Sequence, residues 1–280
     1  MKHSFRTHDG RKLTYRREGS GPLLVCHPGG PGFSSRYLAD LGGLGSTREL
    51  VMLDPRGTAD SDAPEDSRAY TTGDYIADVE ELREHLGVDQ LDLLGHSHGG
   101  VVALAYGAAN PDRARRLIAA DSLVRLHPEE QEELMERHRD EPWYDDARRA
   151  LEEEDAGEYA DDSALEAITS RFWPMYFATF DERAAKYVHE SIAGERGNPF
   201  ALKLFNEGIA EWDMRSDLAA IEAPTLAITG EYDFICGPAC AEDIAAGVAG
   251  SEKVVLEDCG HFTFVEKPQE FCAAIERFLS

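Results

Sequence analysis

The chain has 280 residues, of which 42% are hydrophobic, and it carries a formal net charge of −26. This length and apolar content suit one sizeable domain, or a core with an inserted subdomain. The strong negative charge argues against a nucleic-acid partner, because the phosphates would be repelled. No run of the sequence approaches the roughly 20 apolar residues that a membrane span needs. We therefore expect neither nucleic acid nor a membrane as a partner.

Five cysteines occur, and their spacing contains neither a CxxC pair nor a zinc-binding pattern. An odd number of cysteines suits a reducing cytoplasm, in which thiols stay free. The first residues also lack the apolar stretch of a secretion signal. These observations predict a cytoplasmic protein without a metal or another cofactor, and they leave its oligomeric state open.

Strand-like and helical patterns alternate in the first part of the chain. Short apolar runs predict strands at 5–7, 12–17, 23–26, 49–53, 91–94 and 117–120. Helical patterns occur at 72–86, where Thr72 is the expected cap, and at 101–109. The first two strands are turned at Asp9-Gly10 and are expected to form an antiparallel edge of a larger sheet.

The pattern changes between residues 125 and 217, where the alternation stops and the sequence becomes acidic and helical. The acidic runs at 129–133 and 152–155 are interpreted as solvated helix faces. Aromatic residues gather in this segment, and most should fill the core beneath it. Trp173 and Tyr176 are candidates to line a substrate pocket. We predict a helical cap at 125–217, inserted into a core domain formed by 1–124 and 218–280.

Alternation resumes at Pro224, with strands expected at 225–229 and 253–256 and helices at 238–248 and 268–279. Strands that alternate with helices predict an α/β fold with a parallel sheet and right-handed crossovers. The functional residues of such sheets lie at the carboxyl ends of the strands.

The pentapeptide Gly95-His96-Ser97-His98-Gly99 stands between the strand at 91–94 and the helix at 101–109. G-x-S-x-G in this context is typical of a nucleophile elbow, which holds a serine hydroxyl at the head of a helix. Ser97 is therefore the candidate nucleophile. The backbone N–H of His98 should face a developing oxyanion, helped by the helix dipole. Taken alone, the pentapeptide also fits a glycine-rich turn with an incidental serine.

Asp233 and His261 each follow a predicted strand, so Ser97, Asp233 and His261 occur in the chain order of an α/β-hydrolase triad. A histidine can take the serine proton because imidazole titrates near neutral pH, and a carboxylate then stabilises the imidazolium. Asp121 also follows a strand and is an alternative acid, although Asp233 is preferred. The histidines beside Ser97 point away from each other in an elbow, so they predict no metal site.

The sequence resembles α/β-hydrolases of the proline iminopeptidase-like group from about Asp9 to Leu279. The resemblance rests on six motifs: Gly29-Gly30-Pro31-Gly32, Asp54-Pro55-Arg56-Gly57, the elbow with Gly100, Trp212-Asp213, Gly230-Glu231-Tyr232-Asp233 and Gly260-His261. It implies a mostly parallel eight-stranded sheet with helices on both faces and an inserted helical cap. It also implies that the Gly30 N–H is the second oxyanion donor, beside that of His98.

The sequence departs from the group where its aminopeptidases hold the free amine of the substrate with glutamates. Phe234 follows Asp233 at the position of one glutamate, and Lys203 stands near the position of the other, with Glu207 close by. A carboxylate that faces an ammonium group in a dry pocket is a strong contact. Because Phe234 cannot make this contact, it favours a neutral substrate. The candidate substrate-binding residues are Phe234, Trp173, Tyr176 and Glu207.

Three functions remain open at this point. The first is a serine hydrolase that cleaves a small amide or short peptide through an acyl-enzyme, as the resemblance implies. The second is an esterase or lactonase that acts on a neutral small molecule. The third is a non-catalytic binding protein with the same fold.

Overall fold

The computed structural model describes residues 1–157, 159, 162–194 and 197–280. Eight strands within this part of the chain form a single sheet in the order β1-β2-β4-β3-β5-β6-β7-β8. The strands are β1 (Lys2–Arg6), β2 (Lys12–Gly19), β3 (Leu23–His27), β4 (Glu49–Asp54), β5 (Leu91–His96), β6 (Ala114–Ala120), β7 (Thr225–Gly230) and β8 (Glu252–Leu256).

Strand β2 runs antiparallel to both of its neighbours, β1 and β4, and every other pairing in the sheet is parallel. The antiparallel edge expected from the first two strands is therefore confirmed. Because the other strands are parallel, the carboxyl ends of β3 to β8 lie at one edge of the sheet. The mostly parallel α/β fold expected from the sequence is confirmed.

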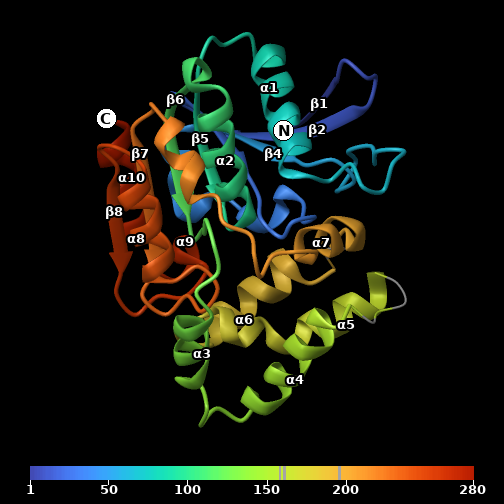
Figure 1. Cartoon of the computed structure of the whole chain (residues 1–280), viewed down its shortest axis with the longest axis vertical. Helices are drawn as coiled ribbons and strands as arrows, with labels where there is room; N and C mark the ends of the chain where they lie inside the picture. Colours follow the sequence, from blue (N-terminus) through green and yellow to red (C-terminus); the bar gives the residue numbers. More distant parts are fainter. Residues whose placement is uncertain (158, 160–161, 195–196) are drawn as a thin grey trace.

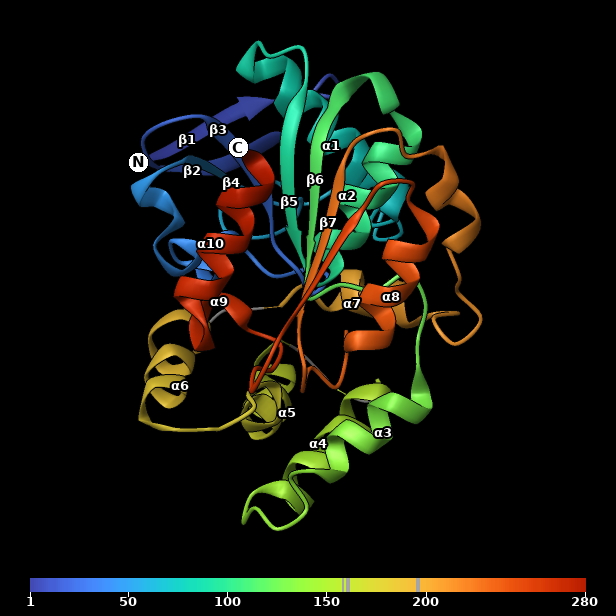
Figure 2. The same cartoon turned by 90° about the vertical axis from the view of Figure 1, so that its left-hand side faces the viewer.

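Helices cover both faces of the sheet, with α1, α2 and α8 on one side and α10 on the other (Figure 2). These core helices are α1 (Thr72–Leu86), α2 (His98–Ala109), α8 (Pro238–Gly247), the short α9 (Thr263–Glu266) and α10 (Pro268–Leu279). Residues of β4 alternate between the two layers: Val51 and Leu53 pack on one side, and Leu50 and Met52 on the other. Because both faces of such a strand pack against a core layer, its sequence is a continuous apolar run.

Helix α1 has the bounds that the sequence predicts, but its cap is Thr71 and not Thr72. The Thr71 side chain accepts a hydrogen bond from the N–H of Asp74, while the Asp74 carboxylate accepts one from the N–H of Thr71. This reciprocal capping box satisfies two backbone donors that the helix itself leaves free. A left-handed glycine, Gly87, ends the helix.

The segment between β6 and β7 carries five helices of the described residues and lies beyond the carboxyl ends of the strands (Figure 1). They are α3 (Pro128–Glu136), α4 (Tyr144–Asp155), α5 (Asp162–Phe172), α6 (Glu182–Tyr187) and α7 (Pro199–Asn206). We call residues 125–217 the inserted segment.

The inserted segment leaves and rejoins the sheet at one point. Arg125 and Asp213 form an isolated antiparallel bridge, and the N–H of Met214 donates to the carbonyl of Val124 at 3.0 Å. This neck is short because β6 and β7 are neighbours in the sheet. None of the helices in the described part of the chain is long and apolar enough to cross a membrane.

Candidate active site

A sharp turn joins β5 to α2, and Ser97 occupies its centre. The backbone of Ser97 has φ 56° and ψ −124°, a strained conformation for a residue with a side chain. A Cβ at Gly95 would lie 1.8 Å from the carbonyl oxygen of Gly99, so only glycine allows the strand and helix to approach this closely. The helix begins at His98, three residues before the predicted start, and Ser97 is therefore its N-cap residue.

Asp233 and His261 are brought together from the loops after β7 and β8. The Nδ1 of His261 lies 2.8 Å from Oδ2 of Asp233, and both side chains are buried. The other oxygen of Asp233 accepts backbone hydrogen bonds from Ile235 and Cys236 at 3.0 and 2.9 Å. These bonds hold the carboxylate in place and direct it at the imidazole.

Asp121, the alternative acid, is also buried at a strand end but faces other partners. It accepts a hydrogen bond from the Thr263 hydroxyl at 2.6 Å and one from the Gly230 N–H at 3.3 Å. Burial, and next the charge of Asp233, raise its pKa well above the usual range of a carboxyl. The structure therefore places Asp233, rather than Asp121, against the ring of His261.

The loop after β3 lies beside the elbow through a chain of hydrogen bonds. The N–H of Gly29 donates to the hydroxyl of Tyr37 at 2.6 Å, and that hydroxyl lies 2.8 Å from Nδ1 of His96. Burial holds the pKa of His96 well below its usual range, so the ring is neutral. Its Nε2 lies 2.9 Å from the carbonyl oxygen of His261 and must carry the proton, because a carbonyl can only accept. The Tyr37 hydroxyl then donates to Nδ1 of His96.

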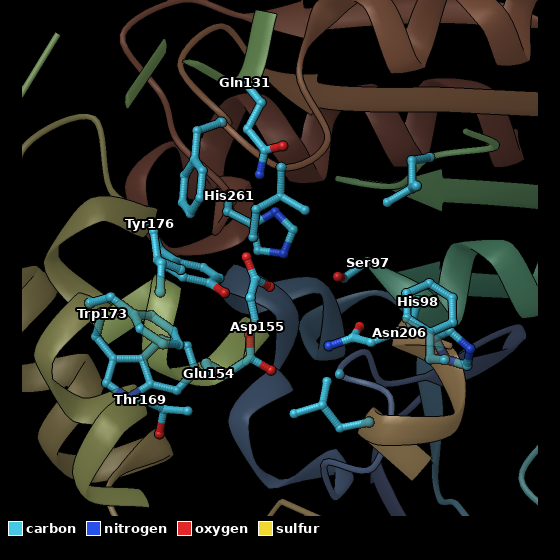
Figure 3. Close-up of a pocket in the computed structure, with 18 of the residues that line it drawn as sticks. Ser97, His98, Gln131, Glu154, Asp155, Thr169, Trp173, Tyr176, Asn206 and His261 are labelled. Carbon is cyan, nitrogen blue, oxygen red and sulfur yellow. The ribbon is translucent and has the colours of Figure 1, made fainter. Parts of the chain in front are cut away.

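A cavity of about 640 Å³ opens between these loops and the inserted segment. Ser97, His261, His98 and Gly30 all line it. Figure 3 shows the Ser97 hydroxyl and the His261 ring facing the same space. Aromatic side chains from the core and from the inserted segment form much of the remaining wall: Phe33, Phe172, Trp173, Tyr176, Phe205, Phe234 and Phe262. Aliphatic side chains line it as well, and Arg148 is a cation among the lining residues.

Three of the four expected substrate-binding residues therefore line the cavity: Trp173, Tyr176 and Phe234. The Tyr176 ring packs edge-on against His261 and against Phe234, with centroid distances of 5.3 Å in both cases. Glu207 is not among the lining residues. It follows the end of α7, is half exposed and lies 3.5 Å from Arg68.

Four carboxylates that the sequence analysis did not select line the cavity: Glu132, Glu152, Glu154 and Asp155. Glu154 and Asp155 stand at the last turn of α4 and are directed toward the space that Ser97 and His261 face (Figure 3). The interpretation of 152–155 as a solvated face is wrong for Glu154, which is half-buried, whereas Glu152, Glu153 and Asp155 are exposed. The acidic run alone carried no signal of this, because only the packing of α4 over the core decides which side chains turn inward.

The environment of Glu154 disfavours its negative charge. Burial, and next the charge of Asp155, raise the pKa of Glu154 to about 7. Burial also raises the pKa of Asp155. Oε1 of Glu154 is buried and has no hydrogen-bond partner within the described residues, while Asn206 donates a hydrogen bond to the carboxylate. An ionised carboxylate with a free oxygen in such a place is stabilised by a cation.

The side chains that could ligate a metal in the described part of the chain are Asp233, Cys236 and His261, whose ligand atoms lie within 4.8 Å of one another. Nδ1 of His261 and Oδ2 of Asp233 already bond to each other. Burial holds the pKa of the Cys236 thiol well above its usual range, so it is not a thiolate. Burial also lowers the pKa of the nearby His98 to about 3. This donor set does not fit a metal ion.

Comparison with known proteins agrees with this architecture. The family described as the alpha/beta hydrolase fold matches residues 22–268. A proline iminopeptidase of Saccharolobus solfataricus is 30% identical over 95% of this chain and 87% of its own. One from Lactobacillus helveticus is 27% identical over 96% of this chain and 92% of its own. The crystal structure of a hydrolase from Pseudomonas aeruginosa PA01 is 28% identical, covers 100% of this chain and 98% of its own, and has a TM-score of 0.73. The chain therefore belongs to the α/β-hydrolase fold family, in which it is proline iminopeptidase-like.

Proposed function

We propose that this serine hydrolase cleaves the amide bond that follows the N-terminal residue of a small amide or short peptide. The Ser97 hydroxyl attacks the substrate carbonyl while Nε2 of His261 takes its proton. Asp233 holds Nδ1 of that ring and stabilises the imidazolium. The backbone N–H groups of Gly30 and His98 stabilise the oxyanion of the tetrahedral intermediate.

The intermediate then collapses to an acyl-enzyme. The C–N bond breaks, and His261 returns its proton to the leaving amine. Water next attacks the ester on Ser97 with His261 as base. The second tetrahedral intermediate releases the acid and restores the serine hydroxyl.

The observation that carries this proposal is the pair of carboxylates, Glu154 and Asp155, facing the cavity of the candidate triad. The Glu154 carboxylate lines the cavity and, when ionised, is an acceptor that suits the ammonium group of a substrate. The C-terminus of α4 adds partial negative charge at the same place. The aromatic and aliphatic part of the wall suits an apolar N-terminal residue such as proline.

A neutral ester or lactone is the second candidate substrate, and Phe234 is the observation that favours it. This residue is buried beside Tyr176 and gives the cavity an apolar surface directly after Asp233. An ester needs no contact with Glu154. A non-catalytic binding protein would use the same cavity without reaction at Ser97.

One side-by-side assay tests these alternatives. It compares turnover of proline 4-nitroanilide and 4-nitrophenyl acetate by the wild type, with Ser97→Ala as the blank and with fluorophosphonate labelling of both. Turnover of the anilide that is lost in Ser97→Ala supports the aminopeptidase. Turnover of the ester alone supports the second candidate. A wild type that is neither labelled nor active would overturn the hydrolase mechanism.

The remaining features of the proposal follow from burial and charge. The inserted segment, residues 125–217, acts as a lid that shapes the substrate site of the core formed by 1–124 and 218–280. A cytoplasmic location is supported by five free cysteines, four of them buried. The net charge of −26 supports a small substrate rather than nucleic acid as the partner.

A further inference from the structure

The main chain at His261 is held by contacts from two other parts of the molecule. Its N–H donates to the carbonyl of Tyr176, in the inserted segment, at 2.8 Å. Its carbonyl accepts the proton on Nε2 of His96, from the elbow strand, at 2.9 Å. The position of the catalytic imidazole therefore depends on the position of the inserted segment relative to the core.

Glu266 connects the same two regions a second time. This buried residue ends α9, five positions after His261. Its Oε2 accepts the N–H of Gly260 at 2.7 Å, and its Oε1 accepts the N–H of Ala178 at 3.0 Å. Gly260 directly precedes the catalytic histidine, and Ala178 lies two residues after Tyr176. One carboxylate thus ties the histidine loop to the inserted segment.

The contact between the two regions is too close for any side chain at Gly260. A Cβ there would lie 2.4 Å from the carbonyl oxygen of Tyr176 and 2.9 Å from the backbone nitrogen of Ala178. The two backbone segments therefore pack directly against each other. In this packing the N–H groups of Gly260 and Ala178, together with a further backbone hydrogen bond from Thr179, converge on the Glu266 side chain, which must offer two acceptor oxygens. A carboxylate does so, whereas an amide offers one oxygen and two donors.

We propose that Glu266 is a positioning residue for the hydrolytic reaction: its carboxylate holds the inserted segment against the loop of His261 and thereby aligns the imidazole with Ser97. Glu266 touches neither the substrate nor the reacting atoms in this role. The inference rests on the proposed function of His261 as the general base.

The role predicts a loss in the chemical step rather than in binding. In Glu266→Gln at least one of these backbone N–H groups faces an amide N–H₂ group and loses its acceptor. The loop and the ring of His261 then shift relative to Ser97. Displacements of this kind lower rates by roughly 10- to 100-fold without removing any substrate contact.

The test uses 4-nitrophenyl acetate as the probe, with the concentration of active sites counted by exhaustive fluorophosphonate labelling. We expect Glu266→Gln to lower kcat per labelled site at least tenfold, to lower the labelling rate constant to a similar extent and to change KM less than twofold. Glu276→Gln is the matched control. Glu276 lies on α10, and within the described part of the chain its side-chain hydrogen bonds come from Thr47 and Arg48.

The outcomes separate this inference from the proposed function. Unchanged kcat per labelled site in Glu266→Gln, whether or not its melting temperature falls, would show a structural role alone and overturn the inference. A wild type that fluorophosphonate does not label would instead overturn the proposed function. If the glutamine variant does not yield folded protein, Glu266→Asp keeps the charge on a shorter side chain. It should lower kcat in the same way, and normal kcat in that variant would also overturn the inference.

Discussion

Replacing Glu154 by glutamine removes the proposed acceptor of the substrate ammonium while keeping the size of the side chain. Glu154 lines the cavity, and Asn206 is the hydrogen-bond partner of its carboxylate within the described structure, so a bond to an ammonium would be an additional contact. A hydrogen bond to a charged group contributes about 1.5–3 kcal/mol. At 1.4 kcal/mol per tenfold change, the loss corresponds to a roughly 10- to 150-fold lower kcat/KM for an amine-bearing substrate.

The assay measures proline 4-nitroanilide and 4-nitrophenyl acetate with the same preparations of Glu154→Gln and wild type at pH 8. We expect the anilide to lose kcat/KM mainly through a higher KM, because the ammonium is bound in the ground state as well as in the transition state. The ester carries no ammonium, so its kcat/KM should change less than twofold.

Glu153→Gln is the control within the same acidic run. The Glu153 side chain pairs with Arg171 and is not among the residues that line the cavity. It should leave the kinetics of both substrates unchanged. Equal losses for anilide and ester in Glu154→Gln would contradict the amine-binding role, and so would an unchanged KM for the anilide.

Three further predictions concern pH, the triad and the core. The pKa of Glu154 is raised to about 7, so its carboxyl is increasingly neutral below that pH. KM for proline 4-nitroanilide should therefore rise as the pH falls from 8 to 6, while KM for the ester stays level. An anilide KM that does not change with pH would count against the amine-binding role. Asp233→Asn should lower kcat by about 10⁴-fold in stopped or continuous assays, with KM nearly unchanged, because Nδ1 of the catalytic imidazole loses its anionic partner; a loss below tenfold would point to another acid. Arg56→Ala should lower the free energy of unfolding in urea by about 3–5 kcal/mol, because buried Asp78 loses its close ion pair and keeps only the longer contact with Arg11 at 3.7 Å; a loss under 1 kcal/mol would refute this.

The sequence predicted the sheet and its helices well because their signals are local. Strands buried on both faces are continuous apolar runs, such as β4, and their ends are marked by glycine, proline and charged residues. The elbow at Ser97 was predictable for the same reason, since its glycines and its neighbouring elements are adjacent in the chain. The pairing of Asp233 with His261 required only the rule that parallel strands end at one edge.

The substrate site was predicted less well because it is made by packing between distant segments. Nothing local distinguishes Glu154 and Asp155 from Glu152 and Glu153, and all four were interpreted as a solvated face. The resemblance directed attention to the positions after Asp233 and near Lys203, whereas the carboxylates that line the cavity come from α3 and from the end of α4. The rotation of α4 over the core decides which carboxylates face the cavity, and that rotation depends on contacts that no short stretch of sequence records.

The neck of the inserted segment has a consequence for protein engineering. Since the chain leaves β6 and returns to β7 through a bridge between Arg125 and Asp213, a different insertion could be grafted at this junction without altering the sheet. Such a chimera would still require a backbone carbonyl where Tyr176 now meets the N–H of His261, and an N–H for Glu266. A grafted segment must therefore supply these two backbone groups in addition to the side chains that line the cavity. The structures of candidate grafts can be checked for these two backbone groups before any variant is produced.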